Sequence, residues 1–125
     1  MIYLFMGNGA KDGGGIHIMG DQASPVIENN LITQNTSGGI GVFLNASPTI
    51  DGNTITDNHG PHLIAGGLFV ALDASPVITN NTIQGNQGGA LWVDDSSSIL
   101  DALVQTRWHI SADHRETGRY ILEMK

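Results

Sequence analysis

The chain has 125 residues, with 17 Gly, no Cys, and 5 Lys or Arg against 12 Asp or Glu, which gives a formal charge of −7. This composition fits one small domain, and it excludes disulfides and thiolate metal sites. Residues 13–100 contain no Lys or Arg, so we expect no nucleic-acid partner and no polyanionic sugar. The longest apolar run, Met1 to Met6, is too short for membrane insertion.

One sequence motif, Ala-Ser-Pro-x-Ile, occurs three times, beginning at Ala23, Ala46 and Ala74. Each copy continues with two Asn and a second Ile, then a Gly pair, then a short apolar run. The Pro residues of the three copies are 23 and then 28 residues apart, which indicates a repeat of about two dozen residues with one insertion.

The content of the repeat excludes a helical unit, because Gly, Asn, Pro, Ser and Thr occur in every copy. Alternating β-branched residues bounded by Asn and Gly predict short strands, and the Gly pairs are expected to supply positive φ at corners. Because so short a unit cannot bury its apolar residues alone, we expect coils to stack on one another. The predicted fold class is all-β, a parallel β-helix of about four coils of 22–28 residues.

Asn recurs at two fixed positions of the repeat, three and eight residues after the first Ile. Stacked coils would align these side chains into ladders, in which each amide bonds the backbone and the equivalent amide one coil away. The first predicted ladder contains Asn30, Asn53 and Asn81. The second predicted ladder contains Asn8, Asn35, Asn58 and Asn86.

These repeated motifs resemble the right-handed parallel β-helix repeats of the pectin-lyase-like superfamily, especially the short Asn- and Gly-rich coils of NosD-like bacterial surface proteins. The resemblance covers residues 1–99 and implies a solenoid whose first coil is incomplete, since Phe5 falls in the second Ile position. It says little about activity, because the superfamily contains lyases, hydrolases, epimerases, adhesins and inert spacers.

Residues 100–125 lie outside the repeat and contain four of the five basic residues. One interpretation is an end cap, in which a helix places Leu100, Leu103, Val104 and Trp108 over the last coil. The alternative interpretation is a poorly ordered tail that is foreign to the fold.

The outward position of the strand after each Gly pair reads His17, Phe43, Ala71 and Trp92 on successive coils. Such a column would extend along the solenoid at the inter-strand spacing of about 4.8 Å. We interpret His17, Phe43 and Trp92 as a candidate surface for a neutral polysaccharide. Alternatively, these rings reflect the strand propensity of aromatic residues, or a neighbouring segment covers them.

Asx residues follow the same strands, at Asp21, Asn45, Asp73 and the pair Asp94 and Asp95. Converging carboxylates at Asp73, Asp94 and Asp95 could hold Ca²⁺. Without a bound cation, repulsion between Asp73 and Asp94 would raise the pKa of a carboxyl group of this pair. Asx residues are also ordinary turn initiators, which is the structural alternative.

The insertion at residues 59–63 contains His59 and His62, and Asp57 precedes it. These three side chains form a candidate metal site, although their spacing matches no established one. A surface loop that happens to contain His is the alternative.

No Lys or Arg lies in residues 13–100 to assist a lyase. Asp94-Asp95 with His59-Gly60 resembles fragments of the polygalacturonase pattern, but the order is reversed and the basic motif is missing. We therefore predict a non-catalytic scaffold segment of a larger extracellular, cell-surface or periplasmic protein, with a glycan-binding face. The alternative is a fragment of a carbohydrate-active enzyme whose catalytic coils lie elsewhere. Open solenoid ends also predict flanking coils or end-to-end self-association.

Overall fold

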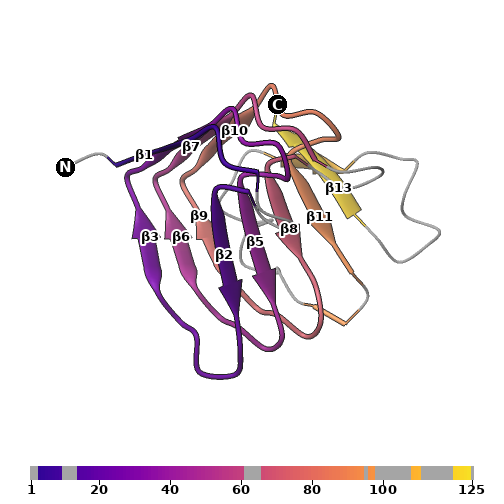
Figure 1. The fold of residues 1–125 in the computed structure, drawn as a ribbon. Helices are drawn as coiled ribbons and strands as arrows, with labels where there is room; N and C mark the ends of the chain where they lie inside the picture. The colour runs from indigo at the N-terminus through magenta and orange to yellow at the C-terminus, as the bar shows by residue number, and fades with distance from the viewer. Residues whose placement is uncertain are drawn as a thin grey trace.

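The computed structural model describes residues 3–9, 14–60, 66–94, 96–97, 108–110 and 120–124, and it forms a solenoid of parallel strands (Figure 1). Three sheets, which we name A, B and C, extend along the solenoid. Sheet A contains β1 (Leu4–Met6), β4 (Leu31–Thr33), β7 (Thr54–Thr56) and β10 (Thr82–Gln84). The parallel part of sheet B contains β2 (Ile16–Met19), β5 (Ile40–Phe43), β8 (Leu68–Val70) and β11 (Leu91–Val93). Sheet C contains β3 (Val26–Glu28), β6 (Thr49–Asp51) and β9 (Val77–Thr79).

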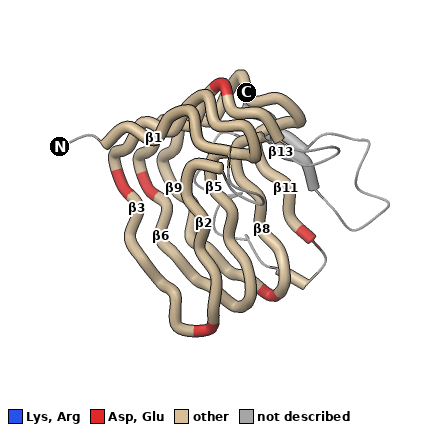
Figure 2. Tube along the Cα trace, viewed as in Figure 1, with Lys and Arg blue, Asp and Glu red and all other residues tan. Residues whose placement is uncertain are grey.

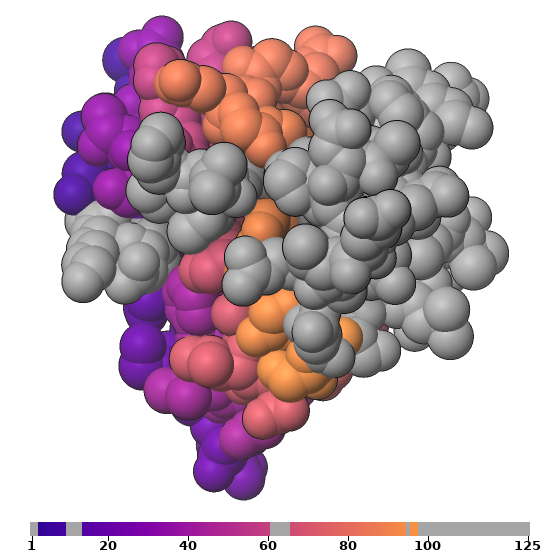
Figure 3. Space-filling model, turned by 90° about the vertical axis from the view of Figure 1, so that its right-hand side faces the viewer, coloured from indigo at the N-terminus to yellow at the C-terminus, as the bar shows by residue number. Residues whose placement is uncertain are grey.

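The chain visits the sheets in the order A, B, C, so that β1–β3, β4–β6 and β7–β9 are three coils, and β10 and β11 begin a fourth. Phe5 pairs with Ile32, which confirms that Phe5 occupies the second Ile position of the repeat. In the space-filling view the coils follow one another across the molecule in chain order (Figure 3). The prediction of an all-β solenoid is confirmed.

The core consists of aliphatic columns, because the inward residue of each strand lies directly above its counterpart one coil away. In sheet A, Ile32 pairs with Ile55, which pairs with Ile83, and all three are buried. In sheet C, Ile50 and Ile78 are fully buried. Sheet B contributes two further columns, which contain Ile40, Leu68 and Leu91, and Val42, Val70 and Val93.

Both Asn ladders are present. In the first, Asn30 donates from its backbone N–H and its side-chain Nδ2 to Oδ1 of Asn53, and Asn53 donates in the same way to Asn81. In the second, the same pair of bonds joins Asn8 to Asn35, Asn35 to Asn58, and Asn58 to Asn86. The ladders therefore satisfy polar groups at two corners of each of the first three coils and at the one described corner of the fourth.

The two residues of the Gly38–Gly39 pair serve different purposes, whereas the sequence suggested only positive φ for the Gly pairs; in Gly88–Gly89 both residues do have positive φ. Gly38 has a φ of 91°, as a left-handed corner requires. Gly39 has no positive φ. A Cβ atom at Gly39 would lie 2.8 Å from the Gly67 carbonyl oxygen and 2.9 Å from Cγ2 of Ile55, so the second Gly is needed for close stacking of coils.

The described part of the tail is strand, so a helix that includes Trp108 was the wrong prediction. β12 (Trp108–Ile110) and β13 (Tyr120–Met124) pair antiparallel, and β13 pairs antiparallel with β11. β13 also lies near β10, so the hairpin crosses the end of the solenoid. The predicted cap residues Leu100, Leu103 and Val104 lie outside the described residues. No helix in the described ranges is long and apolar enough to cross a bilayer.

Candidate functional site

An aromatic row crosses the outer face of sheet B, one ring per coil. The ring centroids of His17 and Phe43 are 4.9 Å apart, those of Phe43 and Phe69 are 5.1 Å apart, and those of Phe69 and Trp92 are 4.6 Å apart. The first pair is stacked, and the second meets edge to face. These are the separations at which aromatic pairs attract one another.

The register of this row differs from the prediction, which placed Ala71 where Phe69 lies. His17 pairs with Gly41, Gly41 with Phe69, and Phe69 with Trp92. Gly41 has no side chain, which leaves room for the ring of Phe43 between those of His17 and Phe69. Sequence reasoning missed Phe69 because it aligned Phe43 and Ala71 with His17 and Trp92. Phe43 pairs with Met19, so it lies two residues further along its strand than Gly41, which shares a position with His17, Phe69 and Trp92.

A groove of about 420 Å³ lies over the aromatic row. Its walls are the four rings together with Met19, Ala71, Leu72 and Asp94. Phe43 and Trp92 are only 5% and 8% exposed, so they form the floor. Met19 is 52% exposed and Leu72 is 50% exposed, and Phe69 is half-buried. The surface that a ligand meets is therefore formed by His17, Met19, Phe69 and Leu72.

Leu72 is held at the groove in an unusual backbone conformation. Its φ is 60°, and that of Leu44, one coil earlier, is 52°. Residues with a branched apolar side chain and positive φ are uncommon, because the Cβ atom crowds the backbone. Both side chains are nevertheless exposed. Of these two strained leucines, Leu72 contributes its side chain to the wall of the groove.

Asp94 fixes the turn that contains Leu72. Its carboxylate accepts hydrogen bonds from the Leu72 backbone N–H at 2.8 Å, from Ser96 Oγ at 3.0 Å and from the Ser97 backbone N–H at 3.0 Å. Ser96 Oγ in turn accepts a bond from the Asp73 backbone N–H at 2.9 Å. Partial burial alone would raise the pKa of Asp94, but the bonds from Leu72, Ser97 and Ser96 together lower it below its usual value.

The pKa that we expected to be raised at Asp94 is therefore lowered, because the carboxylate is surrounded by hydrogen-bond donors instead of a second carboxylate. Of the other predicted calcium ligands, Asp73 follows Leu72 in the turn that Asp94 and Ser96 hold, and Asp95 lies outside the described residues. Over the ranges that the structure describes, no three His, Asp or Glu side chains gather closely enough to hold a metal ion.

The insertion contributes its backbone to the stack. The His59 N–H donates to the Asn35 carbonyl oxygen, and the His59 carbonyl oxygen accepts from the Gly38 N–H. His62, the second predicted metal ligand of the loop, lies outside the described residues.

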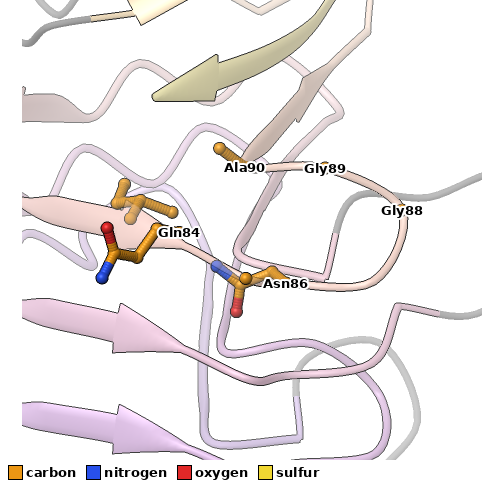
Figure 4. Close-up of a pocket in the computed structure, with 7 residues that line it drawn as sticks. Gln84, Asn86, Gly88, Gly89 and Ala90 are labelled. Carbon is orange, nitrogen blue, oxygen red and sulfur yellow. The ribbon is translucent and has the colours of Figure 1, made fainter. Parts of the chain in front are cut away.

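A second hollow of about 440 Å³ lies at the corner between β10 and β11 (Figure 4). Its lining is mostly Gly, Ala and amide groups, with Gln84 and Asn86 the larger polar side chains. The Asn86 amide is already engaged, since Nδ2 donates to the Ile55 carbonyl oxygen and Oδ1 accepts from Asn58. None of the described residues that line this hollow is ionisable.

The charge of the described surface has one sign. Figure 2 shows dispersed acidic residues and, in the part of the chain that the structure describes, no Lys or Arg. Asp94 is the acidic residue of the groove over sheet B.

A family model described as the right-handed β-helix region matches residues 5–105. Searches of curated proteins and of solved structures gave no match. The matched segment contains nearly all of β1 to β11 and the aromatic row. The chain therefore belongs to the right-handed β-helix family.

Proposed function

We propose that this β-helix is a non-catalytic scaffold whose groove over sheet B binds a neutral glycan. The observation that carries the proposal is the aromatic row, with one ring per coil, beneath an open apolar groove. A sugar ring has apolar C–H faces and a polar rim, so it requires apolar surface with a few hydrogen-bonding groups at the edge.

The exposed parts of the groove have that composition. Phe69, Met19 and Leu72 offer apolar surface for C–H faces. His17 lies at one end of the row, and Asp94 lies at the other end, so both ends offer a polar group to hydroxyls. The ligand would extend across the coils, parallel to the solenoid axis, because the rings repeat in that direction.

Electrostatics favour a neutral ligand. A uronate or sulfated glycan would need a basic residue to offset its charge, and the described surface supplies only acids. The lowered pKa of Asp94 keeps that carboxylate ionised at neutral pH, which adds repulsion against an anion in the groove.

The strained backbone at Leu72 also supports the proposal. A non-Gly residue with positive φ costs about 1 kcal/mol or more, and such strain tends to be retained at functional sites. Asp94 and Ser96 accept two hydrogen bonds from this turn, and a third bond joins Ser96 to Asp94. A glycan that covered Leu72 would account for that arrangement.

Calorimetric titration with neutral oligosaccharides, and with uronate oligosaccharides of equal length, tests the proposal. We expect binding of at least one neutral series and none of the uronates. Phe69→Ala should weaken that binding at least tenfold, about 1.4 kcal/mol. Thr54→Ala, on the exposed face of sheet A, is the matched control and should leave the affinity unchanged. If millimolar neutral glycan gave no heat, or if Phe69→Ala bound as well as the parent chain, the proposal would be wrong.

A further inference from the structure

The second Asn ladder ends at Asn86 with two hydrogen-bond donors that have no described acceptor. In each earlier rung, the backbone N–H and the side-chain Nδ2 donate together to Oδ1 of the Asn one coil ahead. Asn86 accepts this donor pair from Asn58, but residues 87–125 contain no Asn to form a further rung. One hydrogen of Asn86 Nδ2 is engaged by the Ile55 carbonyl oxygen. The other hydrogen and the Asn86 N–H remain for an acceptor that the described residues do not supply.

These two donors lie at the hollow between β10 and β11 (Figure 4). The described lining residues of the hollow, 83–86 and 88–90, all belong to the fourth coil, so the hollow lies on the far side of that coil from Asn58. In Figure 4 the Asn86 oxygen points the opposite way, toward the earlier coils, as its bond to Asn58 requires. The hollow is therefore the place where a further rung would lie.

The ladder itself shows which atom suits this donor pair. The same pair binds an amide oxygen three times, at Asn35, Asn58 and Asn86, with donor–acceptor distances between 2.8 and 3.1 Å. An amide oxygen accepts two bonds and, unlike a hydroxyl, brings no hydrogen that needs its own acceptor. A carboxylate would leave its charge unpaired, because none of the described lining residues is basic. The donor pair thus favours a neutral amide carbonyl group.

We propose that this hollow binds the acetamido group of a neutral N-acetylated sugar, whose carbonyl oxygen takes the place of the next Asn Oδ1. The volume of about 440 Å³ lies within the range of small-molecule sites. The exposed Gln84 amide offers both a donor and an acceptor to the sugar hydroxyls, while Gly88 and Gly89 leave room for the ring. The hollow shares no described lining residue with the groove over sheet B, so this site does not depend on the function proposed for that groove.

Nuclear magnetic resonance titration of the isotope-labelled whole chain with N-acetylglucosamine tests the proposal. We expect saturable shifts at the Asn86 backbone and side-chain amides and at Gly88 and Gly89. Glucose lacks the acetamido group and should bind at least tenfold more weakly. Acetamide alone should shift the same Asn86 resonances, because it carries the recognised carbonyl oxygen.

Two variants test the donors and the hollow separately. Asn86→Asp retains an oxygen for the bonds from Asn58 but removes both Nδ2 hydrogens, so it should weaken binding of N-acetylglucosamine at least tenfold. Asn8→Asp makes the same exchange at the first rung of this ladder and is the matched control, which should bind as the parent does. Gln84→Trp narrows the hollow from its exposed rim without altering the ladder, and it should also weaken binding at least tenfold. Circular dichroism shows which variants remain folded.

The possible outcomes separate this site from the groove. Equal binding of glucose and N-acetylglucosamine, or no shift at Asn86 with either, would overturn the proposal. Shifts confined to Phe69 and Trp92 would also overturn it, while supporting the function proposed for the groove. A short Asn-containing peptide that bound more tightly than the sugar would assign the hollow to a protein side chain and would equally contradict a sugar site.

Discussion

The Asn residues of the ladders show why one residue type occupies each rung. Asn58 donates from Nδ2 to the Ile32 carbonyl oxygen one coil back and to Oδ1 of Asn86 one coil ahead, while its own Oδ1 accepts from Asn35. An Asp has no amide hydrogens to donate, and a Gln is one methylene too long for the same corner. Every group of the side chain is therefore used, which made the ladders the most reliable prediction from the sequence.

Asn58→Ala should reduce the free energy of unfolding by about 2–4 kcal/mol, because it leaves several buried groups on Asn35, Ile32 and Asn86 without partners. Urea denaturation measures the change. The terminal rung provides the control, since Asn8→Ala removes only the bond from its Nδ2 to Asn35 Oδ1, keeps the backbone N–H bond, and should cost about 1 kcal/mol or less. Equal losses for the two variants would contradict a ladder that depends on burial.

Asp94 should make the stability of the fold decrease as the pH falls into the acid range. Its pKa is lower in the folded chain than the unfolded value of about 3.9, so its hydrogen bonds stabilise the fold above that pH. The contribution is lost as pH falls through the folded pKa. Asp94→Asn should therefore be less stable at pH 7 and should lose less stability between about pH 4 and pH 2.

Thermal unfolding of both chains across this pH range checks the prediction. Ser96→Ala is the companion variant, because it removes one of the bonds to Asp94 and retains the carboxylate. It should give a smaller loss at pH 7 and a pH dependence close to that of the parent. Parallel pH curves for Asp94→Asn and the parent chain would show that Asp94 does not stabilise the Leu72 turn.

The strands show where sequence reasoning succeeded and where it failed. Each repeat carries an inward Ile, and a side-chain period of two fixes the register of sheets A and C. The outer face of sheet B has no residue type that recurs in every coil, because Gly41 occupies the position that holds His17 and Phe69 in the adjacent coils. The position of Phe69 follows from packing between coils, which a single repeat pattern does not encode.

Sheet C contains an unfavourable neighbour pair that can be relieved. Glu28 pairs with Asp51, so the two acidic side chains lie next to one another on neighbouring strands, and bonds from Thr79 and Asn80 lower the pKa of Asp51, which keeps that carboxylate ionised at neutral pH. Glu28→Gln should therefore increase the free energy of unfolding slightly, because it removes the acidic group opposite Asp51. Urea denaturation at low salt measures this gain.

The control for Glu28→Gln is the same measurement in about 1 M NaCl, where the Debye length falls to about 3 Å and the repulsion is screened. The gain should then largely disappear. A gain that persisted in salt would indicate packing or hydrogen bonding of the introduced amide as its source, in place of relieved repulsion.

At the scale of the whole molecule, the two ends of the solenoid differ. β13 covers the edge of β11 by antiparallel pairing, whereas the first coil leaves its edges without a described neighbour. The sequence located the change near residue 100, because the composition changes there. It did not predict a hairpin, because the tail contains no repeat from which to infer register.

A chain that ends at residue 105 should be less stable and more prone to associate, because loss of β13 exposes the edge of β11. We expect the Tm to fall by roughly 5–10 °C, which corresponds to one or two kcal/mol in a domain of this size. Calorimetry and gel filtration measure the two effects. An unchanged Tm would mean that pairing of β13 with β11 contributes no stability.

The antiparallel hairpin also constrains how such a protein can change length during evolution. A parallel coil presents the same core positions and the same Asn corner above and below, and equivalent rungs lie 23, 27 or 28 residues apart. Duplication of one coil within the stack would therefore preserve every pairing around it. A coil added after β13 would meet a strand that runs in the opposite direction, with no Asn rung in register. Lineages of this fold should thus gain and lose coils internally, while the hairpin is inherited as a terminus.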